Sequence, residues 1–380
     1  MSSLLSAKRY VALDVLRGMT VAGMILVNNP GSWSNIFAPL RHAPWIGCTP
    51  TDLVFPFFLF VVGAALAFSF KGFSKLYKRA ALIFLTGLLL NAFPFYPPFP
   101  DHNLSFWQNL ADYYGHLRIF GVLQRIALSY ALAGTLVLWL KKPRRICIAL
   151  GVLLLSHWAA LYFFGGTDPY SKETNIAGII DLWLLGDNHI YHGYGLPFDP
   201  EGLLGMITGA GTVLMGYLAG HCIRTSMGKT EAAANLYTYG LASLGAGMVW
   251  SIVLPISKAL WTSSYVLYAG GWTLVMLGFF VYLIDIRGKE KWFYPFKALG
   301  RNPLFAFVMA GVLTKTLGRV IHWNTPDGTT TNVLGWFYNN VCAAVFGNNE
   351  LGSLAFAVIY VLLFTLMAVA LYKKNIIIKL

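Results

Sequence analysis

A histidine and an aspartate stand out in the stretch RHAPWIGCTPTDLVFPFFLF, residues 41–60. His42 lies between Pro39 and Pro44, and Asp52 stands where an unbroken apolar run begins. An imidazole is well suited to take a proton from an amine or hydroxyl near neutral pH, and it can also carry an acyl group as a nucleophile. A neighbouring carboxylate would fix its tautomer and stabilise its protonated form, as in a catalytic triad. The pair predicts acid–base or acyl-transfer chemistry; a plain hydrogen-bonding histidine is the alternative.

Membrane spans must position these residues. The chain has 380 residues, of which 57% are hydrophobic and only 11% charged, and apolar runs of bilayer-crossing length recur along it. Ten spans are expected, at residues 11–29, 52–70, 77–94, 118–140, 145–164, 203–223, 236–257, 264–285, 303–323 and 353–372. We therefore expect an all-α polytopic membrane protein, with residues 1–380 forming a single transmembrane domain.

The N-terminus and the cysteines add two further expectations. The first residues, MSSLLSAKRY, lack the apolar core and cleavage site of a signal peptide, so the first span should remain in the mature chain. Cys48, Cys147, Cys222 and Cys342 are far apart and show no metal-binding spacing. Neither a metal site nor a disulfide framework is therefore expected.

Basic residues gather on one side of the expected spans. With the N-terminus inside, the cytoplasmic segments carry Lys8, Arg9, Lys71, Lys75, Lys78, Arg79, Lys141, Lys142, Arg144, Arg145, Arg224, Lys229, Arg287, Lys289, Lys291, Lys297, Arg301, Lys373, Lys374 and Lys379. The opposite loops hold only Arg41, Lys172 and Lys258. The positive-inside rule therefore predicts that both termini are cytoplasmic. The net charge of +13 indicates topology, and no nucleic-acid partner is expected.

The loops on the opposite side are long and aromatic. Residues 30–51, 95–117 and 165–202 are rich in Pro, Gly, Trp and Tyr. Binding groups usually sit on loops held by a rigid scaffold, which favours a site opening on this side; an aromatic belt at the membrane interface is the alternative. Acidic residues such as Asp199 and Glu201 also gather here. They could hold a protonated amino sugar, or merely reflect the scarcity of Lys and Arg in translocated loops.

Polar residues inside the spans need a partner or a function, because an isolated charge in lipid is costly. Asp14 and Arg17 are three residues apart on one helical face, where a structural ion pair and a functional role are both open. Asn28, at the far end of the same span, could cap the helix or bind a substrate. Arg125, next to Gln124, should face the bundle interior and pair with a carboxylate or a ligand anion.

A basic patch is expected on the cytoplasmic face. Lys78 and Arg79 lie near the start of the third span, and Arg301 and Asn302 lie at the start of the ninth. Such a patch could contact lipid headgroups or hold a polyanionic cofactor. The sequence contains neither a P-loop nor a GxGxxG turn, so neither ATP nor a dinucleotide is indicated.

Several blocks of the sequence resemble one family. They are LDVLRG (13–18), VNNPG (27–31), HAPWIGCTPTDLVFPFFLFVVG (42–63), GVLQRIALSY (121–130), FDPEGLLG (198–205), LWTSSYVLYAGGW (260–272) and ALGRNPLFAF (298–307). In this order they resemble heparan-alpha-glucosaminide N-acetyltransferase and its bacterial relatives. The block that begins at His42 is specific, whereas LDVLRG alone is weak because other membrane acyltransferases begin similarly.

The resemblance implies a transmembrane enzyme that takes an acetyl group from cytosolic acetyl-CoA and delivers it to the amine of a glucosamine-type sugar on the far side. The family's active histidine falls on His42 and its partner asparagine on Asn28, and Asp52 is expected beside the histidine. The residues expected to bind the donor along a tunnel from the cytoplasm are Arg17, Lys78, Arg79, Gln124, Arg125, Arg301 and Asn302. The residues expected to bind the acceptor are Trp45, Asp199, Glu201, Trp261 and Tyr265.

Two mechanisms and two rival functions stay open. His42 would either deprotonate the acceptor amine for direct attack on the thioester or carry the acetyl group itself. One rival is a transporter or flippase for a sugar or lipid-linked sugar, with Asp14, Arg17, Arg125 and Lys315 forming the pathway. The other is an O-acetyltransferase acting on an envelope glycan. The expected partners are coenzyme A, an amino sugar and the lipid bilayer, and the family also suggests a bacterial inner-membrane location and a homodimer.

Overall fold

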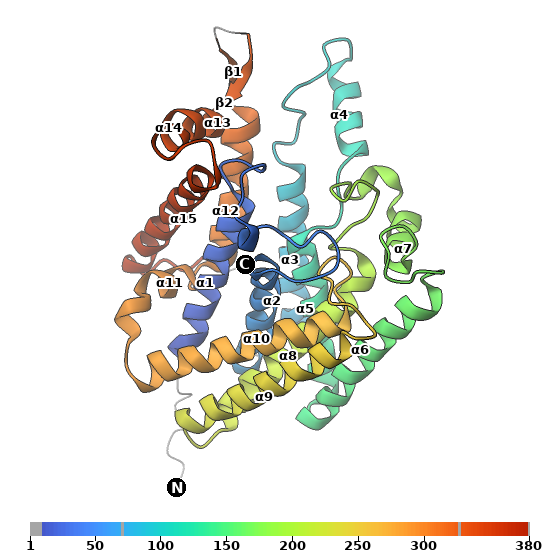
Figure 1. Ribbon diagram of the computed structural model, residues 1–380, viewed down its shortest axis with the longest axis vertical. Helices are drawn as coiled ribbons and strands as arrows, with labels where there is room; N and C mark the ends of the chain where they lie inside the picture. The colour runs from blue at the N-terminus through green and yellow to red at the C-terminus, as the bar shows by residue number, and fades with distance from the viewer. Residues whose placement is uncertain (1–9, 70–71, 326–327, 379–380) are drawn as a thin grey trace.

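The computed structural model describes residues 10–69, 72–325 and 328–378, and these residues are mostly helical (Figure 1). The α-helices are α1 (Val11–Asn28), α2 (Pro50–Ser69), α3 (Phe73–Ala92), α4 (Phe106–Gly115), α5 (Val122–Leu140), α6 (Pro143–Phe164), α7 (Ile176–Leu185), α8 (Leu203–Thr225), α9 (Lys229–Trp250), α10 (Ser263–Phe280), α11 (Tyr294–Leu299), α12 (Pro303–Lys315), α13 (Val333–Phe337), α14 (Ala343–Phe346) and α15 (Glu350–Lys373). Short 3-10 or π-helical segments are η1 (Ala38–Leu40), η2 (Asp187–His189), η3 (Val281–Ile286), η4 (Glu290–Phe293), η5 (Thr316–Val320) and η6 (Tyr338–Cys342).

One hairpin departs from the expected all-α fold. Strands β1 (His322–Asn324) and β2 (Thr330–Asn332) pair antiparallel, with His322 opposite Asn332. Both strands contain β-branched or aromatic residues, which favour extended backbone. The span was expected to continue to residue 323. Its last helical segment, η5, ends at Val320.

Eight helices are long and apolar enough to cross a membrane, by length and composition among the described residues. They are α1, α2, α5, α6, α8, α10 with η3, α12 with η5, and α15. The expectation of a polytopic helical membrane protein agrees with this set. The two other expected spans coincide with α3 and α9, but α3 opens with three basic residues and α9 carries several polar ones. The count of ten spans therefore stays a prediction.

The orientation in the membrane and the domain boundaries also stay predictions. Lys8, Arg9, Lys71 and Lys379, which contribute to the positive-inside argument, lie outside the described residues. The span expected at residues 236–257 is wrong at both ends, since α9 begins at Lys229 and ends at Trp250. Helix α9 ends at Trp250 rather than at residue 257, because the next residues form turns that lead to Pro255, which cannot continue a helix.

Helix α8 lies at the centre of the bundle, where it packs against α2, α5, α6 and α10. A Cβ atom added to Gly63 of α2 would lie 1.9 Å from the carbonyl oxygen of Val213, and one on Gly216 of α8 would lie 1.9 Å from that of Phe60. The two backbones are therefore in direct contact, as small residues permit in membrane bundles. This close pair gives a rigid base to the segments at the start of both helices.

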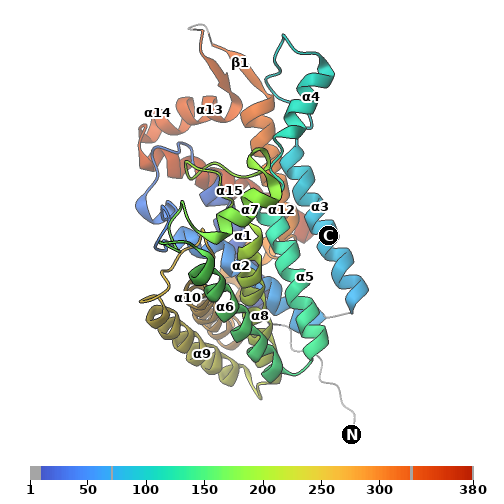
Figure 2. The same cartoon turned by 90° about the vertical axis from the view of Figure 1, so that its right-hand side faces the viewer.

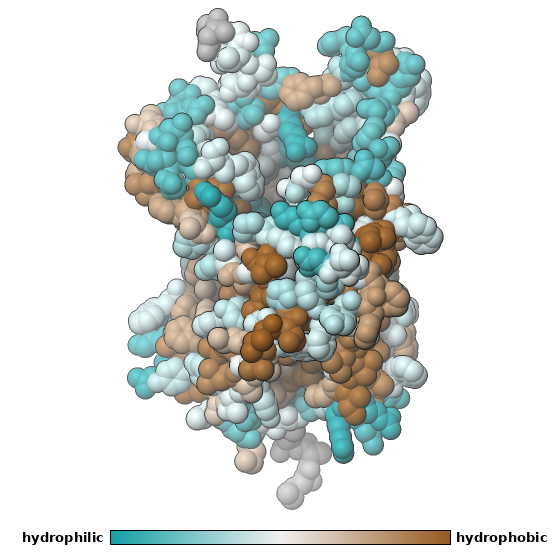
Figure 3. All heavy atoms as spheres, turned by 45° about the vertical axis from the view of Figure 1, so that its right-hand side comes forward, coloured by the Kyte–Doolittle hydropathy of each residue, from teal (hydrophilic) through white to brown (hydrophobic). Residues whose placement is uncertain are grey.

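The surface fits a chain embedded in lipid. Figure 3 shows apolar side chains over much of the bundle, whereas the two projections around α4 and the β1–β2 hairpin are mostly hydrophilic. The view turned by 90° shows α3 and α5 on the side opposite to α9 and α10 (Figure 2). Exposed apolar residues on α6, α9 and α15 include Val152, Leu241 and Leu362. A bilayer would cover such faces.

Candidate active site

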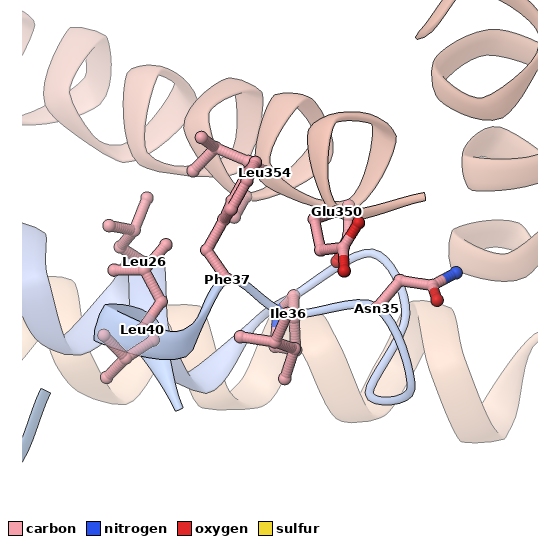
Figure 4. Close-up of a pocket in the computed structure, with 11 residues that line it drawn as sticks. Leu26, Asn35, Ile36, Phe37, Leu40, Glu350 and Leu354 are labelled. Carbon is pink, nitrogen blue, oxygen red and sulfur yellow. The ribbon is translucent and has the colours of Figure 1, made fainter. Parts of the chain in front are cut away.

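The loop that carries His42 is fastened to α15 on one side. The backbone N–H of Gly31 donates to the carbonyl of Ser353 over 3.2 Å. Further along the loop, Phe37 points toward α15 beside Leu354, over a small crevice (Figure 4). The first half of the loop therefore cannot move without disturbing α15.

On its other side the loop joins the segment between α9 and α10. The N–H of Gly47 donates to the carbonyl of Ile256 over 2.7 Å. Gly47 adopts a φ of +109°, in a region that glycine occupies with little strain. This bond brings the segment around Lys258 next to His42, although 216 residues separate the two in the sequence.

The start of α2 holds the Asp52 carboxylate in place. Pro50 occupies the first helical position, which its fixed φ suits. The backbone N–H and the hydroxyl of Thr49 donate to Asp52 Oδ2 over 3.0 and 3.1 Å, and the N–H of Ala43 does so over 3.1 Å. The residues TPTD thus form a helix start related to a capping box.

Asp52 lies against His42. The distance between Nδ1 of His42 and Oδ1 of Asp52 is 2.7 Å. The carboxylate side chain is 1% exposed, whereas the imidazole is 43% exposed. Since a carboxylate accepts, we assign the proton of the neutral ring to Nδ1, which leaves Nε2 as the basic nitrogen.

Lys258 completes a cluster of three groups. Its Nζ atom lies 3.1 Å from Nδ1 and 3.4 Å from Nε2 of His42, and 3.6 Å from Oδ1 of Asp52. Burial lowers the pKa of the Lys258 ammonium, while the carboxylates of Asp52 and Glu201 act in the opposite direction. Sequence reasoning gave Lys258 no role; its one signal was that it is among the few basic residues of the outer loops.

An open cavity of about 540 Å³ lies in front of this cluster. Its polar or charged lining includes Asn28, His42, Arg118, Lys172, Glu201 and Lys258. Met24, Phe55 and Phe307 supply apolar surface. A partly apolar pocket with a few convergent polar groups is a typical small-molecule site.

The two asparagines at the end of α1 have different roles. Asn29 is buried; its amide donates to the carbonyl of Ile25 over 2.7 Å, and its oxygen accepts from the Thr314 hydroxyl over 2.6 Å. Asn28 is exposed to the cavity and makes no side-chain hydrogen bond within the described ranges. Helix-end bonding thus falls to Asn29, and the amide of Asn28 is available to a ligand.

Arg118 forms a buried ion cluster that sequence reasoning missed. Its guanidinium donates to both oxygens of Asp199, over 2.9 and 2.6 Å, and to Oε2 of Glu201 over 2.5 Å. It also lies 4.6 Å from the ring centroid of Tyr191. Although burial acts in the other direction, the two carboxylates raise the pKa of Arg118. Burial would raise the pKa of Glu201, but Arg118 and other cations lower it.

Of the residues expected to bind an acceptor, only Glu201 lines the cavity. Asp199 is engaged by Arg118, and Trp45 packs at its ring edge against other aromatic residues and donates its Nε1–H to the carbonyl of Tyr170. Trp261 and Tyr265 are fully buried. The Tyr265 hydroxyl donates to the backbone carbonyl of Asp52 over 2.6 Å. These rings therefore support the site from behind.

The comparison with known proteins identifies the family of the chain. The family model described as "Heparan-alpha-glucosaminide N-acetyltransferase, catalytic" matches residues 9–246, which include the loop of His42, α2 and the Arg118 cluster. The chain belongs to the heparan-alpha-glucosaminide N-acetyltransferase family.

Two members of this family show how far the similarity extends. Heparan-alpha-glucosaminide N-acetyltransferase of Mus musculus is 29% identical over 377 residues, covering 81% of this chain and 54% of the mouse protein. The Homo sapiens protein of the same name is 27% identical over 365 residues, covering 79% of this chain and 52% of the human one. The chain thus spans about half the length of these relatives.

The residues that the family resemblance suggested for the donor lie away from the described cavity. Arg17 contacts Oδ1 of Asp14 at 3.4 Å and donates to the carbonyl of Gly300 over 3.3 Å. Arg79 and Arg301 are close enough to Arg17 to repel it electrostatically. Arg17, in the second turn of α1, thus forms a basic cluster with Arg79 of α3 and Arg301, which follows α11. Lys78, Arg17, Arg79 and Arg301 are all absent from the lining of the cavity beside His42.

Other expected donor residues have structural partners. The side chain of Asn302 binds the C-terminal segment, donating to the carbonyl of Ile376 and accepting from the N–H of Ile378. Gln124 donates to the carbonyl of Ile119 over 2.9 Å. Arg125 is buried with its guanidinium 4.7 Å from the ring centroid of Trp261, and it donates to the carbonyl of Gly202 over 3.3 Å. A role for these three in donor binding stays a prediction.

The residues of the rival transport pathway do not converge. Asp14 and Arg17 pair with each other beside α11, and Arg125 lies under the start of α8. The Lys315 ammonium donates to the carbonyls of Leu90, Asn91 and Phe93 at the end of α3. No observation on the described residues thus favours a pathway through these charges.

Proposed function

We propose that this chain transfers the acetyl group of acetyl-CoA to the amine of a glucosamine-type sugar. The observation that carries the proposal is the 2.7 Å contact between His42 and Asp52 at the wall of an open cavity. Membership of the N-acetyltransferase family supports the reaction class. The relatives' names supply the amino sugar as the class of acceptor.

The proposed reaction needs one base. Nε2 of His42 takes a proton from the acceptor amine, whose nitrogen attacks the carbonyl carbon of the thioester. A C–N bond forms, the C–S bond breaks, and the proton passes from the imidazolium to the sulfur of coenzyme A. Asp52 holds Nδ1–H and stabilises the imidazolium. In the two-step version, Nε2 attacks the thioester first and the C–S bond breaks, releasing the thiolate of coenzyme A. The amine then takes the acetyl group from Nε2, and its proton passes through the freed imidazole to the thiolate.

Three neighbouring groups have proposed roles in binding and charge stabilisation. The Lys258 ammonium lies beside the basic nitrogen, where it would stabilise negative charge on the thioester oxygen or departing sulfur. The free amide of Asn28 would orient one of the two substrates. Glu201 is fixed by Arg118 through Oε2, and we propose that it attracts the protonated form of the acceptor.

We further propose that the donor comes from the cytoplasmic side of a bacterial inner membrane. The arginine cluster of Arg17, Arg79 and Arg301 would hold its phosphates. Between Arg17 and Met24, where the lining of the cavity begins on α1, the helix rises by about 10 Å. The flexible arm of coenzyme A is long enough for this distance. For the donor to react at His42, the cavity must extend along α1 from Met24 to Arg17 in a conformation of the protein that binds coenzyme A.

The first test measures transfer from radiolabelled acetyl-CoA to glucosamine by the purified protein. His42→Ala should abolish transfer, whereas His102→Ala, which changes an exposed histidine of the 95–105 loop, should not. Undiminished transfer by His42→Ala would reject both versions of the mechanism. Label retained on the protein without acceptor would select the two-step route, and acetylation of sugars that lack an amine would point to an O-acetyltransferase.

A further inference from the structure

A second cavity adjoins the one beside His42. It has a volume of about 430 Å³ and shares Met24, Asn28 and Phe307 with the first. Asn28, the residue with the free amide, thus lies at the junction of the two cavities. The two cavities are therefore neighbours, separated by these three side chains.

The second cavity follows one face of α12 and η5. Residues about one helical turn apart line the cavity on this face, namely Phe307, Ala310, Thr314 and Gly318. Only 11% of the residues of Pro303–Val320 are buried, so this helix is loosely packed against the bundle. Its other residues are half-buried, except for Arg319 and Val320 at its end, which are exposed.

The two ends of the cavity differ in character. The end at Met24, Ile25, Phe307 and Ala310 is apolar. Lys315 and Arg319 line the other end, four residues apart on the same helical face.

The two cations at that end have different surroundings. The Lys315 ammonium is fixed by the carbonyls of Leu90, Asn91 and Phe93. Arg319 is exposed, and within the described ranges its side chain has neither a hydrogen bond nor an ion pair. A guanidinium fork of this kind is well suited to a phosphate, and a fixed ammonium beside it adds a second positive charge.

We propose that the second cavity binds a lipid-linked amino sugar in which a phosphate joins the sugar to an apolar chain. The inference rests on the proposed function and specifies the class of acceptor. The phosphate lies at Arg319 and Lys315, and the chain runs past Ala310 toward Phe307, deeper along the helix. The sugar extends past Asn28, so that its amine reaches Nε2 of His42. The positively charged end of the cavity matches the phosphate of such a ligand, and the apolar end matches its chain.

A binding experiment tests this without relying on catalysis. Native mass spectrometry compares retention of three probes: dodecyl glucosaminyl phosphate, neutral dodecyl glucosaminide and glucosamine 1-phosphate. The dodecyl phosphate compound should bind best, and Arg319→Gln should weaken its binding about tenfold because a charge-assisted contact is lost. The control Arg144→Gln changes an exposed arginine at the start of α6 and should leave binding unchanged.

Three results would overturn the inference. They are equal binding of the neutral glucosaminide, binding of glucosamine 1-phosphate as tight as that of the dodecyl compound, and an Arg319→Gln protein that binds like the native one. Equal competition by dioleoyl phosphatidic acid would also reject it, because the site would then be a general phospholipid site. Each of these comparisons can be made in the same membrane-mimetic preparation.

A transfer experiment then separates this inference from the proposed function. With acetyl-CoA, kcat/KM for dodecyl glucosaminyl phosphate should exceed that for glucosamine about tenfold or more, and Ala310→Leu should reduce this ratio by narrowing the apolar end. Acetylation of glucosamine with no preference for the lipid-linked compound would overturn the inference alone. Binding of the lipid-linked compound without any acetylation would overturn the proposed function and leave the binding site standing.

Discussion

The Nζ atom of Lys258 lies 3.1 Å from Nδ1 of His42, so that the imidazole contacts an ammonium as well as the carboxylate of Asp52. The three groups come from the loop before α2, from α2 itself and from the segment between α9 and α10. An ammonium at this position adds positive charge where a thioester would react. Lys258 is therefore expected to act in the transfer step and not only in folding.

Replacing Lys258 with Met should lower kcat by about 10²- to 10³-fold, the usual effect of removing one group that stabilises an oxyanion. Lys258→Arg should retain part of the rate. Because burial lowers the pKa of Lys258, the folded state holds its charge less readily than the unfolded chain does. Loss of the charge should thus leave the melting temperature at neutral pH unchanged or raised. A melting temperature that fell in parallel with kcat would instead show a purely structural lysine.

The same lysine predicts a pH effect on the rate. Its lowered pKa means that the ammonium loses its proton below the ordinary value of 10.5, so the rate of the native protein should fall with rising pH in that range. The Lys258→Met protein should lack this fall. A profile of kcat between pH 7 and pH 10.5 for both proteins provides the measurement. If kcat of both proteins fell equally at high pH, the decrease would belong to another group near the cavity.

Asp52→Asn should reduce kcat by about 10²- to 10⁴-fold, because an amide can present its N–H to Nδ1 and favour the wrong tautomer of His42. Asp112→Asn is a matched control, since Asp112 pairs with His116 on the exposed surface of α4. Acetyl-CoA should still raise the melting temperature of the Asp52→Asn protein if only the chemical step is lost. Near-native kcat in this protein would remove Asp52 from the mechanism.

The sequence predicted the helices far better than the contacts between loops. Long apolar runs need a helix in the bilayer, so helices such as α1, α2 and α15 follow from local composition. The proximity of Asp52 to His42 could be anticipated because both flank a single helix start. Lys258 reaches the same place only through the Gly47–Ile256 bond between remote loops, for which the sequence gives no signal.

The buried aromatic and ionic residues show a second limit of sequence reasoning. Trp261 and Tyr265 belong to one of the sequence blocks that resemble the family, and such rings can either stack on a sugar or fill the core. In the structure they are core residues, packed against Arg125 and Asp52. Asp199 was expected to bind an amino sugar, but it binds Arg118 in the loop before α5. The pairing of charges depends on which loops lie next to each other in the fold, and the hydropathy of the sequence does not predict this.

Arg118→Gln should destabilise the protein by about 3 to 5 kcal/mol, because it leaves the carboxylates of Asp199 and Glu201 buried without their cation. Adding Asp199→Asn should restore part of the loss. Arg118 and neighbouring cations lower the pKa of Glu201. The ionised Glu201 therefore stabilises the folded state at neutral pH, and this stabilisation is lost as the pH falls. Thermal unfolding of the single and double variants at pH 7 and pH 4 measures both effects. A double variant less stable than Arg118→Gln would contradict this account.

Asp181 on α7 should make stability depend on pH in the opposite direction. Its Oδ1 accepts from the N–H of Leu203 at the start of α8 over 2.9 Å, whereas its buried Oδ2 has no partner among the described residues. A Cβ atom on Gly202 would lie 1.7 Å from that oxygen, so the carboxyl is tightly enclosed. Burial raises the pKa of Asp181 to about 7. The protonated form is therefore favoured in the folded state.

The sign of the effect follows from that raised pKa. Stability from the neutral carboxyl is fully present below pH 3.8, the ordinary pKa of an aspartate, and is lost as the pH rises through about 7. Asp181→Asn keeps a neutral side chain at every pH, so it should raise the melting temperature by several degrees at pH 8 and by clearly less at pH 5, where only part of the stability has been lost. Asp187→Asn, at an exposed aspartate of η2, should have no such pH-dependent effect. Equal shifts for Asp181→Asn at pH 5 and pH 8 would show that Asp181 is ionised throughout this range, with a cation or water serving its second oxygen.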